Sequence, residues 1–167
     1  KGQREAMTDL RRIVKVLTEA KIEFILVGGA AATAHGASRL TQDIDIVYCR
    51  SAENIQRLVD VLGPYDPYMR GAPPGLPFLW DSTTIHRGLN FTLTTSLGDL
   101  DLLGEIAGGG GYEELLPHTM TLEAFGIECL CLKIEPLIRV KRAAGRPKDL
   151  EAIAELEALL EERTERE

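Results

Sequence analysis

The sequence has few of the features that mark membrane proteins, disulfide scaffolds and zinc proteins. It contains no apolar run approaching the roughly 20 residues of a membrane helix. It shows no signal-peptide pattern, so we expect a cytoplasmic protein. Its three cysteines, Cys49, Cys129 and Cys131, are an odd number without framework spacing, and the three histidines show no spacing typical of zinc ligands. We therefore expect the cysteines to be structural.

Positive charge is also scarce. The 167 residues include 19 Lys and Arg against 26 Asp and Glu, which gives a net charge of -7 and a pI of about 5.1. Such a chain is not suited to general duplex binding, because nucleic-acid affinity depends largely on neutralising phosphates. A negatively charged substrate would need a metal ion or a local basic patch. The length and the 44% hydrophobic content fit one globular domain over residues 1–167.

Hydrophobic periodicity predicts strands and helices that alternate without a regular βαβ order. Strands are predicted over residues 24–27, 43–48 and 127–132, and between 83 and 106 around a hairpin at 96–98. Helices are predicted over residues 8–20, 30–34 and 51–62, and as a C-terminal pair over 136–144 and 147–163. Residues 64–80 hold five prolines and are predicted to form a loop. The pattern predicts an α+β fold with a mixed sheet within residues 22–132, helices mainly on one face, and the C-terminal helical pair.

Two acidic residues alternate with apolar ones in the second predicted strand. Asp43 and Asp45 are two residues apart, so their side chains point to the same face. Two adjacent carboxylates repel each other unless a cation lies between them. Magnesium is a hard ion that binds carboxylate oxygens and leaves positions for substrate phosphates. The pair therefore predicts a metal site.

A pair of glycines precedes these acids. Gly28 and Gly29 follow the first predicted strand, where glycine allows the backbone to come close to a phosphate and free N–H groups can bind the anion. An ordinary tight turn would also explain the pair. Combined with the acids on the next strand, however, it predicts a site for a metal–triphosphate complex.

Basic residues concentrate in one segment near the C-terminus. Lys141 and Lys148, together with Arg142 and Arg146, either form a solvated helix face or attract a triphosphate toward the acids. Closer to the acids, Arg39 and Thr41 either contact phosphate or stabilise their own loop. Trp80, in the proline-rich loop, either shapes a substrate pocket or packs on the surface.

The sequence resembles the nucleotidyltransferase superfamily of the DNA polymerase β type over roughly residues 22–160. The matching residues, in chain order, are Val27-Gly28-Gly29, His35-Gly36, Arg39, Thr41 and Asp43-Ile44-Asp45-Ile46. Among small bacterial members it is most similar to the abortive-infection (AbiEii-like) and related uncharacterised nucleotidyltransferases. Those proteins often carry a later lysine followed by Arg-x-Lys-Asp, as Lys141 and Arg146-Pro147-Lys148-Asp149 do here.

The resemblance implies a third carboxylate on a later strand, and Asp101 is the favoured candidate. It lies between apolar residues as Asp45 does, whereas its rival Asp99 follows Gly98 at a predicted turn, where aspartate is common for backbone reasons. The three acids would hold Mg²⁺ or Mn²⁺ and catalyse transfer of a nucleotidyl group from a nucleoside triphosphate such as ATP to an acceptor hydroxyl. The third acid would help to activate that hydroxyl as a general base.

The acceptor is not determined by these residues. Candidates are a tRNA end, a protein side chain as in toxin–antitoxin pairs, and a small molecule, and the negative net charge favours a cationic small molecule or a protein over a long RNA. An alternative is a non-catalytic nucleotide- or partner-binding module on the same fold. Activity that depends on a partner protein, and a homodimer, are further possibilities.

Overall fold

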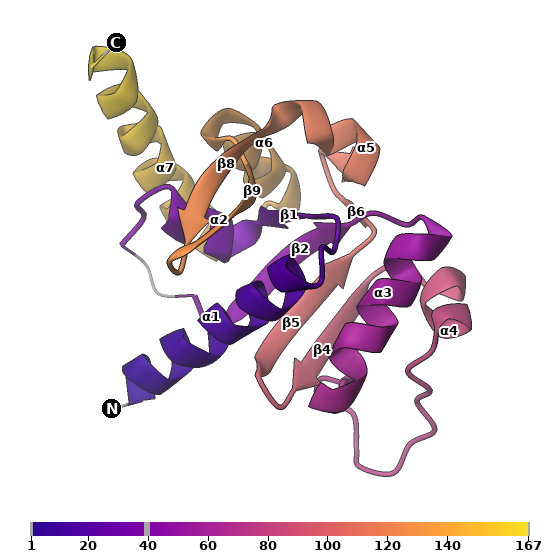
Figure 1. Ribbon diagram of the computed structural model, residues 1–167. Coiled ribbons are helices and arrows are strands. Elements are labelled where there is room, and N and C mark those ends of the chain that lie inside the picture. The colour runs from indigo at the N-terminus through magenta and orange to yellow at the C-terminus, as the bar shows by residue number, and fades with distance from the viewer. Residues whose placement is uncertain (1, 39–40, 167) are drawn as a thin grey trace.

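A computed structural model describes residues 2–38 and 41–166, in which helices pack around a seven-stranded sheet (Figure 1). The strand order in this sheet is β3-β4-β5-β2-β1-β9-β8, and β6 and β7 form a separate two-stranded sheet. The strands are β1 (Phe24–Val27), β2 (Asp43–Tyr48), β3 (Tyr68–Met69), β4 (Phe91–Thr95), β5 (Gly98–Leu103), β6 (Glu105–Ile106), β7 (Gly110–Gly111), β8 (Thr119–Ala124) and β9 (Ile127–Leu132).

The helices precede, separate and follow these strands. They are α1 (Gly2–Glu19), α2 (Gly28–Ala34), α3 (Ala52–Leu62), α4 (Ser82–Arg87), α5 (Tyr112–Leu115), α6 (Ile134–Ala144) and α7 (Pro147–Arg166), with 3₁₀ turns η1 (Gly63–Tyr65) and η2 (Leu116–His118). None of the helices within residues 2–38 and 41–166 combines the length and the apolar character needed to cross a membrane.

The sheet is mixed, as predicted. Strand β2 pairs antiparallel with β1 but parallel with β5, and β1 also pairs parallel with β9. The hairpin predicted at residues 96–98 joins β4 to β5. The α+β class and the C-terminal helical pair are confirmed, because α6 and α7 pack on each other and α6 also contacts α2.

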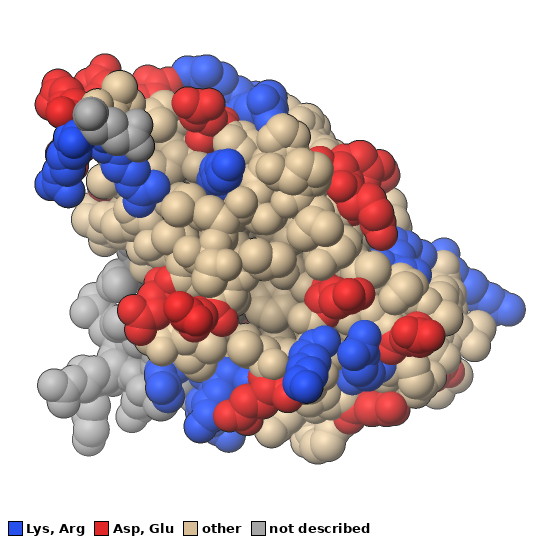
Figure 2. Space-filling view, turned by 45° about the horizontal axis from the view of Figure 1, so that its top comes forward, with Lys and Arg blue, Asp and Glu red and all other residues tan. Residues whose placement is uncertain are grey.

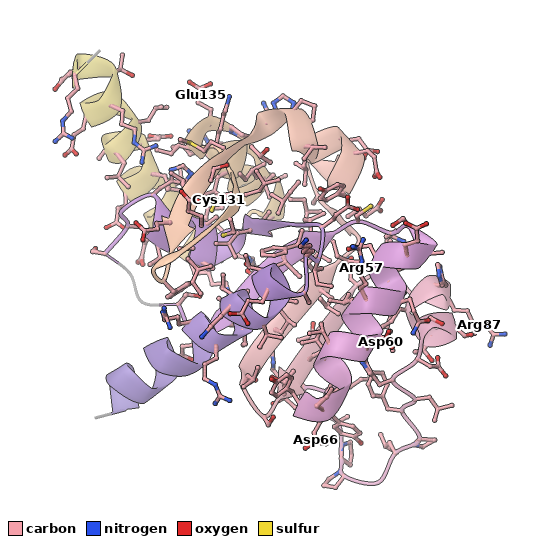
Figure 3. The ribbon with its side chains drawn as sticks, viewed as in Figure 1. Arg57, Asp60, Asp66, Arg87, Cys131 and Glu135 are labelled. Atoms are coloured by element: carbon pink, nitrogen blue, oxygen red, sulfur yellow. The ribbon has the colours of Figure 1, made fainter. Side chains whose placement is uncertain are left out.

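The two faces of the central strands have different roles. Along β2 and β5 the side chains of Ile44, Ile46 and Leu100 are fully buried, and they join the core beneath α1 and α3. Because side chains alternate between faces, the aspartates between them point to the opposite side. Cys131 on β9 is likewise buried in the core (Figure 3), and all three cysteines are buried and unpaired.

The structure differs from the sequence prediction at residues 82–87 and 119–124 and in the proline-rich loop. Residues 82–87 form helix α4 rather than a strand, because Asp81 accepts a hydrogen bond from the backbone nitrogen of Thr84 at 2.8 Å and caps the helix. Residues 119–124 form the edge strand β8, which the sequence analysis missed. The proline-rich loop contains the two-residue strand β3, which extends the sheet beyond β4.

Candidate active site

The acidic side chains of β2 and β5 converge on the face opposite α1 and α3. In the parallel register Asp45 lies beside Asp101, and Asp43 beside Asp99. Ligand oxygens of Asp43, Asp45 and Asp101 all lie within 4.8 Å of one another. The structure therefore brings together the three carboxylates that the sequence analysis favoured, and Asp99 lies on the same face but outside this cluster.

This cluster is short of positive charge. Burial, the charge of Asp43 and a hydrogen bond with Asp101 raise the pKa of Asp45 to about 8. Its Oδ1 atom is shielded from solvent and has no hydrogen-bond partner among the described residues. Burial and the charge of Asp101 also raise the pKa of Asp43, although Arg70 partly opposes this shift. A cation between these carboxylates would relieve the repulsion that raises the two pKa values.

The donor set suits a hard divalent cation. Three carboxylates from two neighbouring strands provide only oxygen ligands, and Oδ1 of Asp45 offers a lone pair that no group among the described residues uses. Mg²⁺ and Mn²⁺ both prefer oxygen ligands of this kind. Asp43, Asp45 and Asp101 are thus the residues that would hold such an ion.

The glycine pair allows the backbone to approach the acids. Gly28 has φ +62°, and a Cβ atom there would lie 2.0 Å from Oδ2 of Asp45. A Cβ atom at Gly29 would lie 3.0 Å from Oγ1 of Thr41, which itself donates to the carbonyl of Asp43 at 2.8 Å. Any side chain at Gly28 would displace a carboxylate, so the turn must be glycine for the site to keep its shape.

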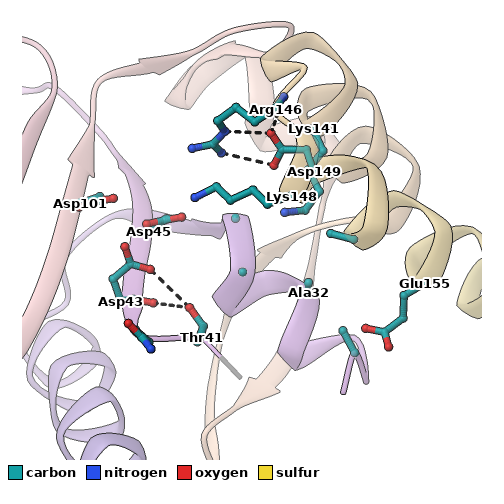
Figure 4. A pocket seen from close by; sticks show the side chains of 15 residues that line it. Ala32, Thr41, Asp43, Asp45, Asp101, Lys141, Arg146, Lys148, Asp149 and Glu155 are labelled. Carbon is teal, nitrogen blue, oxygen red and sulfur yellow. Dashed lines mark hydrogen bonds and ion pairs between the residues drawn. The ribbon is translucent and has the colours of Figure 1, made fainter. Parts of the chain in front are cut away.

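A pocket of about 350 Å³ joins the acids to the C-terminal helices (Figure 4). Its walls include these predicted residues: Gly28, Gly29, Thr41, Asp43, Asp45, Asp101, Lys141 and Lys148. The remaining predicted residue, Arg39, lies outside the described residues. Burial lowers the pKa of Lys141, while the charges of Asp149 and Asp45 oppose that shift. Acids from the sheet and lysines from α6 and α7 thus face the same space.

A salt bridge fixes the turn between α6 and α7. The Oδ2 atom of Asp149 accepts hydrogen bonds from the backbone nitrogen of Arg146 at 3.1 Å and from its Nε at 2.9 Å. Burial opposes ionisation of Asp149, whose side chain is 3% exposed, but these hydrogen bonds and the charge of Arg146 lower its pKa below the usual range. Arg146 and Asp149 thereby position the start of α7, where Lys148 lies, against the pocket.

A second pocket of about 250 Å³ adjoins the first and shares Gly28 and Asp45 with it. Much of its wall is aliphatic, formed by Val27, Leu103, Ile106, Ala107, Leu137, Val140 and Ala144. The glycine run at residues 108–111 packs here, since a Cβ atom at Gly109 would lie 3.1 Å from Ile106 and 3.2 Å from Val140. At the rim, Oδ1 of Asn90 accepts a hydrogen bond from the backbone nitrogen of Gly104 at 2.8 Å.

Comparison with known proteins identifies the fold through solved structures rather than through sequence. No protein-family model matches the sequence, and no curated protein matches it significantly. Solved structures do match: the lincosamide antibiotic adenylyltransferase LnuA, bound to lincomycin, has a TM-score of 0.60 at 17% identity over 90% of this chain and 96% of that chain. The chain has the nucleotidyltransferase fold.

Two other structures support this assignment of the fold. A Thermotoga maritima protein assigned to the nucleotidyltransferases matches with a TM-score of 0.55 at 15% identity, over 87% of this chain and 88% of that chain. An antigenic nucleotidyltransferase-like protein from Paracoccidioides brasiliensis matches with a TM-score of 0.55 at 17% identity, over 92% of this chain and 75% of that chain. The fold implied by the sequence resemblance is therefore confirmed.

One charged residue of this nucleotidyltransferase fold was missed by the sequence analysis. Arg70 directly follows β3, and its guanidinium contacts the acidic face next to Asp101. Its position depends on an edge strand that the proline-rich composition concealed. Trp80, by contrast, lines neither pocket: its Nε1 donates to the carbonyl of Val59 at 2.9 Å, so it packs on α3.

Proposed function

We propose that the chain is a metal-dependent nucleotidyltransferase that moves a nucleoside monophosphate from a nucleoside triphosphate to an acceptor hydroxyl. The observation that carries this proposal is the pocket in which Asp43, Asp45 and Asp101 face Lys141 and Lys148. Carboxylates that can bind a cation and lysines that can bind an anion line the same pocket. A metal–triphosphate complex satisfies both requirements.

The parts of the pocket suit different parts of this substrate. The lysines would neutralise the β- and γ-phosphates, and the backbone at Gly28 and Gly29 leaves room for them to approach the acids. A divalent ion held by the carboxylates would supply positive charge to the α-phosphate. The acceptor oxygen then forms a bond to the α-phosphorus, the bond to the β-phosphate oxygen breaks, and pyrophosphate leaves. Asp101 would accept the proton of the attacking hydroxyl.

The second pocket favours a small-molecule acceptor. It adjoins Asp45 and Gly28, so a molecule bound there would lie next to the reacting phosphate, and its aliphatic wall suits an apolar ring or chain. LnuA, which shares the fold, is an adenylyltransferase that binds lincomycin, a small molecule. On the face visible in Figure 2, acidic and basic side chains lie together around a largely uncharged centre, so the described part of this face has no extended basic area of the kind that suits a long RNA. We therefore propose a small, largely apolar alcohol as acceptor.

Calorimetry with magnesium and nucleotides tests the proposed site. ATP is the first nucleotide to titrate, because LnuA is an adenylyltransferase. We expect magnesium-dependent binding that the Asp43→Asn/Asp45→Asn double variant loses and the exposed Asp60→Asn variant retains. Nucleotide binding that persists in the double variant, or its absence from the wild-type protein with every nucleotide, would instead favour a non-catalytic module.

The acceptor is tested by filling the second pocket. Ala144 is exposed and lines that pocket alone, so Ala144→Trp should leave the affinity for magnesium–ATP within about twofold, which is less than 0.5 kcal/mol. Ala154→Trp, at an exposed position of α7 that lines neither pocket, is the matched control. Loss of ATP binding in Ala144→Trp alone would assign the second pocket to the nucleobase.

A further inference from the structure

Arg70 makes ionic contacts with three aspartates of the acidic face. Its backbone nitrogen donates to the carbonyl of Thr92 at 3.0 Å, which continues the pairing of β3 with β4 and directs the side chain across β5. The guanidinium lies 2.8 Å from Oδ1 of Asp101, 3.3 Å from Oδ2 of Asp99 and 3.7 Å from Oδ2 of Asp43. Its NH2 group also donates to the carbonyl of Leu93 at 2.7 Å.

Two of these three aspartates belong to the carboxylate cluster of the candidate metal site. Asp43 and Asp101 would be ligands, whereas Asp99 is not part of the cluster. A guanidinium and a divalent ion repel each other at such short range, and each carboxylate oxygen that contacts one is less available to the other. Arg70 and the metal therefore compete for the same two residues.

We infer that Arg70 is an internal counter-cation: it neutralises Asp43 and Asp101 in the metal-free protein and must withdraw from them when a divalent ion binds. This inference rests on the proposed function. It also assigns a role to Asp99, which is the carboxylate that retains Arg70 after withdrawal. The contact with Asp43 is the longest of the three and is lost first.

The position of the guanidinium is consistent with a movement of Arg70 away from Asp43 and Asp101 and toward Asp99. Nε of Arg70 is buried and forms no hydrogen bond among the described residues, although it lies 3.3 Å from Oδ2 of Asp99. A modest rotation toward Asp99 would improve that contact while freeing the two ligands. The side chain is 27% exposed, so space and solvent are available for the movement. The consequence is a site that stays partly neutralised without metal, at the cost of a lower metal affinity.

Manganese binding without nucleotide tests the competition. We expect Arg70→Gln to bind Mn²⁺ about tenfold more tightly than the wild-type protein, because the charged hydrogen bond to Asp101 at 2.8 Å no longer has to be broken and the contact with Asp43 at 3.7 Å is weak. Arg70→Lys keeps the charge but cannot span the same carboxylates, so its affinity should lie between the two. Arg57→Gln removes an exposed arginine from α3 (Figure 3) and should have no effect.

A double-mutant cycle tests the role of Asp99. At physiological salt, Asp99→Asn should weaken Mn²⁺ binding when Arg70 is present and have little effect in the Arg70→Gln background. Circular dichroism of each variant in Mn²⁺ confirms that it is folded before its affinity is compared. An equal effect of Asp99→Asn in both backgrounds would show that Asp99 acts on the metal directly, and would overturn its assigned role.

The outcomes separate this inference from the proposed function. Unchanged or weaker Mn²⁺ binding in Arg70→Gln, with binding abolished in Asp43→Asn/Asp45→Asn, would refute the competition and leave the metal site intact. Wild-type affinity in Arg70→Lys would reduce the role of Arg70 to its charge alone and refute the contact-based exchange. An absence of Mn²⁺ binding in every variant, with and without ATP, would refute the proposed function itself.

Discussion

Replacing Asp45 with asparagine is expected to stabilise the metal-free protein, and to do so more at neutral than at acidic pH. The pKa of Asp45 is about 8 in the folded protein, against 3.8 for an ordinary aspartate. Between these values the folded state holds a proton that the unfolded state has released. This contribution to stability is complete below the unfolded value and is lost as the pH rises through the folded one. Asparagine does not titrate, so the variant lacks this loss.

The size of the effect follows from the number of pH units between the two measurements. Each unit in this window changes the free energy of unfolding by about 1.4 kcal/mol for one titrating group. Between pH 5 and pH 7 the wild-type protein should therefore lose about 2–3 kcal/mol relative to Asp45→Asn. Comparing the two proteins cancels the contributions of groups that titrate in both and lie away from Asp45. Asp43 adjoins Asp45, so the predicted difference includes any change in the pKa of Asp43.

Urea unfolding in EDTA measures this difference directly. Asp60→Asn is the matched control, because Asp60 is an exposed residue of α3 (Figure 3) whose Oδ1 accepts a hydrogen bond from Gln56 at 2.9 Å, and an asparagine oxygen can accept it as well. Its pH profile should follow that of the wild-type protein. Parallel profiles for the wild-type protein and Asp45→Asn would refute the reasoning, because they would mean that Asp45 ionises in the folded state as easily as in the unfolded chain.

Three further substitutions test other parts of the structure. Gly28→Ala adds a Cβ atom 2.0 Å from a carboxylate oxygen at a residue with φ +62°. We expect the free energy of unfolding in urea to fall by about 1–3 kcal/mol and metal binding to be lost. Gly63→Ala is the control and should be tolerated, because its Cβ atom would have no neighbour within 4 Å. Lys141→Met should weaken ATP binding about tenfold by calorimetry, since it removes one charge-assisted contact, and exposed Lys133→Met should not. Burial is the main cause of the lowered pKa of His35, so the stability that its neutral form contributes is present above the unfolded value of 6.5 and is lost as the pH falls. His35→Gln should therefore lose less stability than the wild-type protein between pH 7.5 and pH 5 in urea unfolding. An equal loss in the two proteins would contradict this interpretation.

The acidic part of the site could be predicted from the sequence because it depends on local geometry. The two-residue spacing of Asp43 and Asp45 fixes their common face once the segment is a strand. Asp101 was identified through its family resemblance and its apolar neighbours, and the parallel pairing of β2 with β5 places it beside Asp45. Helix α4 was missed because Thr83, Thr84 and Ile85 favour strands, and the capping residue Asp81 was overlooked.

Contacts between distant segments could not be predicted in the same way. Arg70 reaches the acids because two residues of β3 pair with β4, and no periodicity is detectable in so short a strand. The basic wall depends on the turn between α6 and α7, which the Arg146–Asp149 salt bridge holds in place. The sequence showed a basic segment there but contained no information about its distance from the sheet.

An excess of negative charge explains both the low stability of the metal-free site and its capacity to bind a cation. Acids gather on one face of the sheet, and the buried Oδ1 of Asp45 has no partner among the described residues, so the metal-free protein is destabilised locally. Arg70 relieves part of this repulsion from one side, while Lys141 contributes a favourable charge from the other. Neither can reach every carboxylate oxygen at once, and a small divalent cation can. The same imbalance that lowers the stability of the empty site therefore provides the driving force for binding a cation, and substitutions that relieve it should exchange function for stability.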